Sequence, residues 1–253
     1  MNRRALIISN PGERGDENYC EGVLRDVDNY KSFLTNACGG LWSYSDIDHI
    51  SRPSINEVRL AMRKLEGSGY ALVVFTGHGW YSTDLDSTIL TLKAGQEIDS
   101  VELQKGASKQ TIILDCCRKK FAGIPLDESN LIKASAAVLN RASSRLNAEL
   151  CRHYYNEKIK TCDQGTTILY SCSSGEKSQD NSQRGGLYSY NLIDFAESWA
   201  DNGEFDLTNS YYTLSVVKAH EGATELVQRK RRDQNPQIEK PRSAPYFPFC
   251  VAA

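Results

Sequence analysis

Two apolar runs in this chain of 253 residues each end in residues that can do covalent chemistry. The stretch "VVFTGHGWY" ends with His78 between two glycines, and "TIILDCCRK" ends with the adjacent thiols Cys116 and Cys117. A nearby base turns a thiol into a nucleophile, so a cysteine and a histidine on neighbouring strand ends predict a catalytic dyad. The N–H of Gly79 is a candidate donor to an oxyanion. Taken singly, a buried cysteine or a lone histidine is more often a packing residue.

The elements that must position these residues read as alternating strands and helices. Nearly continuous apolar runs occur at residues 4–9, 70–77, 111–117 and 166–174, with a shorter one at 46–50. Such runs are typical of parallel strands buried on both faces. Helical spacing separates them, and Ser54 with Glu57 forms a capping box at the start of one helix. We therefore expect an α/β fold with a mostly parallel sheet, whose sites lie at the carboxyl ends of its strands.

The remaining segments predict further elements around that sheet. Residues 87–103 read as a hairpin followed by a helix, and residues 129–158 have helical propensity without a convincing strand. Two more helices are predicted within 187–200 and 211–232, and the chain ends in a short apolar strand candidate. No internal repeat or low-complexity tract interrupts this order.

Composition disfavours several classes of partner. Thirty cations against thirty-two acids leave a net charge of −2, so nucleic acid and anionic membranes are not expected partners. The N-terminal apolar run is too short for a signal peptide, which predicts a cytoplasmic protein with reduced thiols and no structural disulfides. Cys151, His153 and Cys162 form the nearest approach to a zinc pattern, but a surface helix explains them better. No metal or cofactor is predicted.

The two reactive motifs resemble those of the caspase and metacaspase superfamily of cysteine peptidases. In that superfamily the histidine lies in an SGHG-like turn, and the nucleophile lies in a D-x-C-[HR] or Q-A-C-R motif. Here "FTGHG" precedes "LDCCRK", and the segments "YCEGVLRDVDNYKSFL", "TTILYSCSSGE", "GGLYSYNLIDF" and "QNPQI" are also similar to family elements. The resemblance implies a caspase-like (caspase-hemoglobinase) fold with about six strands in one domain over 1–253. Within it, 1–117 is large-subunit-like, 118–165 is a linker or helical insertion, and 166–253 is small-subunit-like.

The resemblance and strand geometry together select one of the two thiols. Side chains of adjacent strand residues point to opposite faces, so only one thiol can meet His78. The family places the nucleophile immediately before the arginine, which makes Cys117 the expected nucleophile and Cys116 a packed core thiol. Where the family usually has glycine, this chain has Lys119 and Lys120, so we expect a different loop beyond the nucleophile.

Two aspartates are the expected binders of the substrate side chain. Metacaspases cut after arginine or lysine and carry acids at the positions that match Asp115 and Asp26. Two converging carboxylates favour a cationic residue at P1, the substrate position before the cut. Asp26 is otherwise an ordinary exposed helix charge. Asp115 has an alternative as the ion-pair partner of Arg118, Lys119 or Lys120, which would contradict a pocket role.

The sequence therefore predicts a cytosolic cysteine endopeptidase that cleaves polypeptides after a basic residue, with cell death or defence as the implied pathway. An upstream activator protein is a candidate partner. Asp84 and Asp86 are the nearest candidates for the calcium site of some metacaspases, but they match no EF-hand pattern. The alternatives are a catalytically silent binding scaffold, and a nucleotide-binding α/β protein suggested faintly by "TGHGWYS".

Basic residues between Cys117 and the strand beginning at Thr166 are candidate sites of self-cleavage. Caspase relatives commonly carry there a linker that is cut during maturation. Residues near Lys158 and Lys160 are the first choice and Arg141 and Arg145 the second, although helical backbone would protect them. The alternative is that these cations solvate a surface helix and that the chain works uncut.

Overall fold

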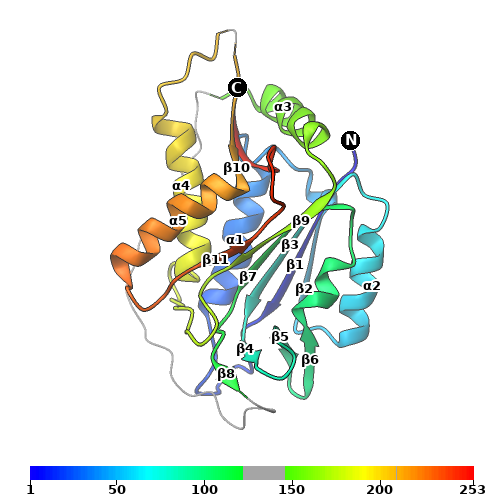
Figure 1. The fold of residues 1–253 in the computed structure, drawn as a ribbon, viewed down its shortest axis with the longest axis vertical. Helices are drawn as coiled ribbons and strands as arrows, with labels where there is room; N and C mark the ends of the chain where they lie inside the picture. Colours follow the sequence, from blue (N-terminus) through cyan, green and yellow to red (C-terminus); the bar gives the residue numbers. More distant parts are fainter. Residues whose placement is uncertain (122–145, 209) are drawn as a thin grey trace.

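The computed structural model describes residues 1–121, 146–208 and 210–253. Within these residues the centre is a six-stranded sheet in the order β11-β9-β7-β3-β1-β2 (Figure 1). Only the β11–β9 pair is antiparallel. The strands are β1 (Arg3–Asn10), β2 (Ile47–Ser51), β3 (Tyr70–Gly77), β7 (Lys109–Asp115), β9 (Gly165–Tyr170) and β11 (Gln237–Glu239). The predicted mostly parallel sheet is confirmed, because the continuous apolar runs are its strands.

Helices cover both faces of the sheet, and alternate strand residues serve the two faces. Ala5 and Ile7 of β1 pack in one hydrophobic cluster, whereas Leu6 and Ile8 pack in the other. The first cluster includes residues of α1 (Gly22–Thr35), α3 (Ala148–Thr161), α4 (Leu187–Asn202) and α5 (Val216–Lys230). The second cluster includes residues of α2 (Ile55–Leu65). This alternation is the physical reason that the strands read as unbroken apolar runs.

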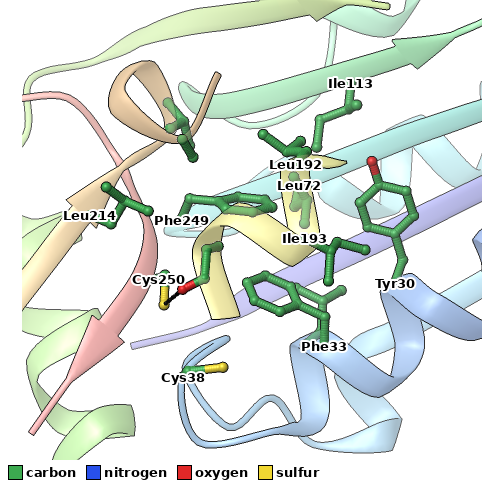
Figure 2. Packing of buried hydrophobic residues seen from close by; sticks show 14 of the residues in the cluster. Tyr30, Phe33, Cys38, Leu72, Ile113, Leu192, Ile193, Leu214, Phe249 and Cys250 are labelled. Atoms are coloured by element: carbon green, nitrogen blue, oxygen red, sulfur yellow. Dashed lines mark hydrogen bonds between the residues drawn. The ribbon is translucent and has the colours of Figure 1, made fainter. Parts of the chain in front are cut away.

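Figure 2 shows how the first cluster fixes α1 and α4 against the sheet. The rings of Phe33 on α1 and Phe249 near the C-terminus stack with centroids 4.8 Å apart. Leu72 of the sheet and Leu192 of α4 are fully buried in the same cluster. Burying side chains of this size contributes roughly 1.5–3 kcal/mol each. The cluster therefore anchors the helices whose ends reach the carboxyl edge of the sheet.

Local sequence signals explain several elements on the second face. Ser54 caps α2, since its Oγ accepts from Glu57 N at 3.3 Å while the Glu57 carboxylate accepts from Ser54 N at 2.7 Å. The predicted hairpin is β5 (Ser87–Lys93) and β6 (Gln96–Asp99), and a 3-10 helix, η2 (Ser100–Gln104), follows where a helix was predicted. The short strands β4 (Gly79–Ser82) and β8 (Lys120–Phe121) were not predicted. They complete a second sheet, ordered β6-β5-β4-β8 over the described residues.

The C-terminal third departs from prediction at two strands. The segment predicted as one helix over 211–232 begins with β10 (Tyr212–Ser215), which pairs with β12 (Pro248–Ala252). The helix starts only at Val216, because Ser215 accepts a hydrogen bond from Lys218 N and caps it there. β11 was not predicted either, as three residues carry too little pattern. A further 3-10 helix, η1, spans Tyr44–Asp46. Of the predicted helical segment 129–158, residues 129–145 lie outside the described part.

Candidate active site

The strand register aligns the two reactive motifs. Thr76 of β3 pairs with Asp115 of β7, and His78 and Cys117 each follow that pair by two residues. Both line one open pocket beyond the carboxyl ends of β3 and β7. This edge is the lower end of the central sheet in Figure 1. The structure thus brings the predicted base and nucleophile to a common pocket.

The turn that carries His78 is fixed by backbone contacts. Gly77 has a φ of +147°, and a Cβ there would overlap the carbonyl oxygen of Asn10 on β1, so only glycine fits. The carbonyl of His78 accepts from Thr91 N of β5 at 3.1 Å. On the pocket side, Nε2 of His78 lies 3.5 Å from the sulfur of Cys20. Cys20 lines the pocket and was not predicted as a site residue.

The two adjacent thiols have different surroundings. Cys116 is 2% exposed and packs among core residues such as Leu6 and Ile8, and its burial raises its pKa well above the ordinary value. Cys117 is half-buried, and its Sγ contacts the carbonyl oxygen of Ser178 at 3.6 Å. A thiol held in a dry core cannot easily ionise. Of the two, Cys117 has the surroundings that the nucleophile requires.

The direction of the Gly79 N–H follows from the strand that contains it. Tyr81 N, two residues further along β4, donates to the carbonyl of Lys119 at 2.8 Å. Backbone N–H groups two residues apart in a strand point the same way. The N–H of Gly79 therefore faces the side of the loop that follows Cys117. That direction suits a donor to an oxyanion formed at Cys117.

The cations that follow Cys117 do not share one role. Arg118 is buried, and its guanidinium donates to Thr88 Oγ1 at 2.9 Å and to the Cys172 carbonyl at 3.1 Å. It also lies 4.0 Å from the centre of the Tyr170 ring. Lys119 lines the pocket. These contacts pin the loop after Cys117 against β5 and the end of β9, and they direct the Arg118 guanidinium to groups other than Asp115.

Asp26 and Asp115 line the pocket that holds Cys117. The Asp26 carboxylate accepts from Thr76 Oγ1 at 2.6 Å and from Gly186 N at 2.9 Å. The Asp115 carboxylate accepts from Ser178 Oγ at 2.6 Å and from Ser189 N at 3.0 Å. Asp26 is 1% exposed, so the reading of it as an ordinary exposed helix charge is wrong.

The two carboxylates are close enough to influence each other. Burial, followed by the charges of Asp115 and Asp180, raises the pKa of Asp26 well above its ordinary value. Both buried carboxylates are held by uncharged donors, as the hydrogen bonds above show. An incoming cation would favour the ionised form of Asp26.

A third carboxylate, Asp180, was missed by sequence reasoning. It lines the same pocket, and one of its oxygens accepts from Gly22 N at 3.2 Å. Its other oxygen, Oδ1, is sheltered and has no hydrogen-bond partner within the described residues. Burial, then the charge of Asp115, raises the pKa of Asp180 to about 6. No local pattern distinguishes this aspartate from exposed ones, so the sequence carried no signal for it.

The "QNPQI" element braces the loop that supplies Ser178 and Asp180. Gln234 donates to the Ser171 carbonyl at 2.9 Å and accepts from Gln179 N at 3.2 Å. Asn235 donates to Glu176 through both its backbone N, at 2.8 Å, and its side chain, at 2.7 Å. The chain between α5 and β11 thereby holds the pocket wall in place.

Other residues considered from sequence lie apart from this pocket. Asp86 is in the turn between β4 and β5, where it accepts from the Tyr81 hydroxyl. Cys151 and Cys162 are buried in the first cluster, whereas His153 is exposed, so the three do not converge. In the described part of the chain, no three His, Cys, Asp or Glu side chains are arranged so that they could hold a metal ion. No helix in the described part is long and apolar enough to cross a membrane.

The chain is similar to known proteins both in sequence and in fold. A family model described as a caspase domain matches residues 2–247. Among solved structures, caspase-1 from Spodoptera frugiperda superposes with a TM-score of 0.58 at 13% sequence identity, covering 94% of this chain and 86% of that one. At that identity the likeness shows a shared fold. No curated protein matches the chain.

Proposed function

We propose that this chain, which belongs to the caspase domain family of cysteine peptidases, cleaves polypeptides after arginine or lysine. Cys117 is the nucleophile in this proposal and His78 is the base. The observation that carries the P1 preference is the set of three aspartates, Asp26, Asp115 and Asp180, in the pocket that also holds Cys117.

The proposed reaction needs only groups of the chain, the peptide and water. His78 takes the thiol proton, and the Cys117 thiolate attacks the carbonyl carbon of the scissile peptide bond. The carbonyl oxygen becomes an oxyanion, to which the N–H of Gly79 donates. Collapse of this intermediate expels the amine, which takes its proton from His78, and leaves a thioester. Water, deprotonated by His78, then hydrolyses the thioester and restores the thiol.

Charge and hydrogen bonding both support a cationic P1 residue. Arginine presents several N–H donors in a rigid fork, which suits carboxylates that converge from different directions. Asp180 Oδ1, sheltered and without a partner in the described part, is an acceptor ready for such a donor. An acidic P1 residue would add a fourth carboxylate to Asp26, Asp115 and Asp180, and the repulsion would exclude it.

Matched peptides that differ only at P1 test this proposal. Fluorogenic substrates with Arg, Lys, Gln or Asp at P1 are compared by kcat/KM, with the Cys117→Ala variant as the control for contaminating proteases. We expect Arg and Lys to exceed Gln by roughly 30-fold or more, because a desolvated charge pair contributes about 2 kcal/mol or more. Preference for Asp or Gln would overturn the proposal.

The proposal includes a division of the domain into a large-subunit-like part, a linker and a small-subunit-like part. The large-subunit-like part, 1–117, and the small-subunit-like part, 166–253, share one sheet through the parallel pairing of β7 with β9. A cut within the proposed linker, 118–165, would leave that pairing in place.

By resemblance alone we assign the peptidase to cell death or defence, with an upstream activator. The test is whether a strain that carries Cys117→Ala loses the cell-death or defence response. An unchanged response would contradict the assignment.

A further inference from the structure

Arg184 lies close enough to the three aspartates of the proposed P1 pocket to interact with their charges. Its backbone is anchored on both sides, because its N–H donates to Asn181 Oδ1 at 3.1 Å and its carbonyl accepts from Asn29 at 2.9 Å. The next residues, Gly185 and Gly186, press against the pocket acids. A Cβ on Gly185 would overlap an oxygen of Asp26, and a Cβ on Gly186 would overlap an oxygen of Asp115.

The side chain of Arg184 is buried without the partners that a buried cation needs. It is 6% exposed, and its Nε and Nη2 have no hydrogen-bond partner within the described residues. Its guanidinium carbon lies 5.9 Å from the centre of the Tyr190 ring. An arginine cannot shed its proton to escape this cost. Some other charge must therefore keep the cation in this position.

That charge comes from the pocket. Asp115, Asp180 and Asp26 all raise the pKa of the Arg184 guanidinium and so oppose the lowering that its burial causes. A charged neighbour of the same sign is Lys230 of α5, which lies over the same Tyr190 ring at 5.5 Å and donates to Asn191. Burial, followed by repulsion from Arg184, lowers the pKa of Lys230. The acids are thus the groups that balance Arg184, and by reciprocity Arg184 balances the acids.

We propose that Arg184 is a positioning residue that supplies the internal counter-charge of the acid pocket. It balances the negative charge of the pocket before a substrate enters, and so sets the pH range over which the pocket accepts a cation. This role rests on the proposed preference for a cationic P1 residue. The charge of Arg184 lowers the pKa of Asp180, so without Arg184 this carboxyl would take up a proton at higher pH, and a less negative pocket would hold a cation poorly.

Binding of benzamidinium, a small cation that resembles the arginine side chain, tests the role without relying on turnover. Its affinity is measured by calorimetry from pH 5.5 to 8 for the wild type, Arg184→Gln, Arg184→Lys and the surface control Arg229→Gln. We expect the midpoint of the pH dependence to rise by about one unit or more in Arg184→Gln, from the loss of one buried charge. Arg184→Lys and Arg229→Gln should keep the wild-type midpoint.

The outcomes separate this inference from the proposed function. Failure of the wild type to bind the cation at any pH would remove the cationic pocket, and with it the role of Arg184. Binding by the wild type with an unchanged midpoint in Arg184→Gln would remove the role of Arg184 alone. Each result overturns a different statement.

A second measurement keeps the inference testable if Arg184→Gln folds poorly. The double variant Arg184→Gln/Asp180→Asn removes one charge of each sign and should regain much of the lost melting temperature. A merely structural role of the arginine stem would not be rescued by neutralising Asp180. Absence of rescue would therefore contradict the counter-charge role.

Discussion

Two buried arginines at opposite ends of the sheet show how one residue type serves two purposes. Arg3 begins β1, donates to the Gly40 carbonyl at 2.9 Å, and lies 4.4 Å from the centre of the Trp42 ring. Arg184 lies at the carboxyl edge, where the groups that balance it are carboxylates lining a pocket. The partners of Arg3 belong to the packed interior, whereas those of Arg184 are also available to a ligand. A buried cation thus points to a site only when its counter-charges face a cavity.

The thiols of the two ends differ in the same way. Cys250 donates to the Ala196 carbonyl at 3.3 Å and is fully buried in the cluster of Figure 2, near the labelled Cys38. Burial raises the pKa of Cys151, in the same cluster, to about 11. Cys117 instead opens onto the pocket beside His78. The same functional group is therefore enclosed in the core at one end and open to a pocket at the other.

Replacing the cysteines at the two ends of the sheet should give the largest changes in activity and stability. We expect Cys117→Ala to lower kcat by roughly 10⁴-fold or more, and His78→Ala to remove turnover through loss of the base. Cys116→Ala should retain much of the activity. Cys250→Ala should cost about 1–3 kcal/mol of unfolding free energy through lost packing, with normal activity per folded molecule. Peptidase assays with denaturant unfolding measure both, and loss of activity in a well-folded Cys116→Ala would show that the nucleophile is misassigned.

The next largest effect concerns Asp115 and Asp26. Replacing either by asparagine keeps the shape and removes one charge, which typically costs roughly 2–5 kcal/mol when the partner is a desolvated cation. We therefore expect kcat/KM for peptides with P1 arginine to fall by about 30-fold or more, with a much smaller change in melting temperature. Equal losses for arginine and glutamine peptides would show that the carboxylates act on folding rather than on P1.

Cleavage after arginine should depend on pH through the ionisation of Asp180. Its pKa is raised to about 6 from an ordinary 3.8, so it is ionised above pH 6 and protonated below. Cleavage after arginine should fall as the pH drops through 6, and Asp180→Asn should lose that step and resemble the low-pH wild type. Because the folded state binds this proton more tightly, the contribution of Asp180 to stability is lost as the pH rises from about 4 to 6. A wild-type step that persists in Asp180→Asn would assign it to another group.

The smallest effect is expected from replacing Lys158 and Lys160, the first-choice sites of self-cleavage. Lys158 and Lys160 lie in the last turn of α3, where the Lys158 carbonyl accepts from Thr161 and Lys160 pairs with Glu157. Hydrogen-bonded helix resists proteolysis, so Lys158→Gln/Lys160→Gln should leave any fragment pattern unchanged. Arg141 and Arg145 lie outside the described residues. Mass spectrometry of fragments from the wild type and Cys117→Ala measures this, and fragments in both or in neither would exclude self-processing.

The sequence alone predicted the five parallel strands of the central sheet and placed His78 and Cys117 beyond the ends of two of them. Apolar runs mark strands buried on both faces, and parallel strands end at one edge, so residues just beyond those ends, such as His78 and Cys117, must lie close together. The capping box at Ser54 is also local, because its two partners are three residues apart. These features follow from period and spacing along the chain.

Only the tertiary structure decided which other residues join them. Asp180 and Arg184 lie in a segment without strand or helix, which returns over the ends of β7 and α1 because Gln234 and the glycines before α4 hold it there. Cys20 lies next to His78 although the two are 58 positions apart in the sequence. Such contacts depend on packing between distant segments rather than on local pattern. The sequence therefore predicts which residues could react, and the fold determines the charges that surround them.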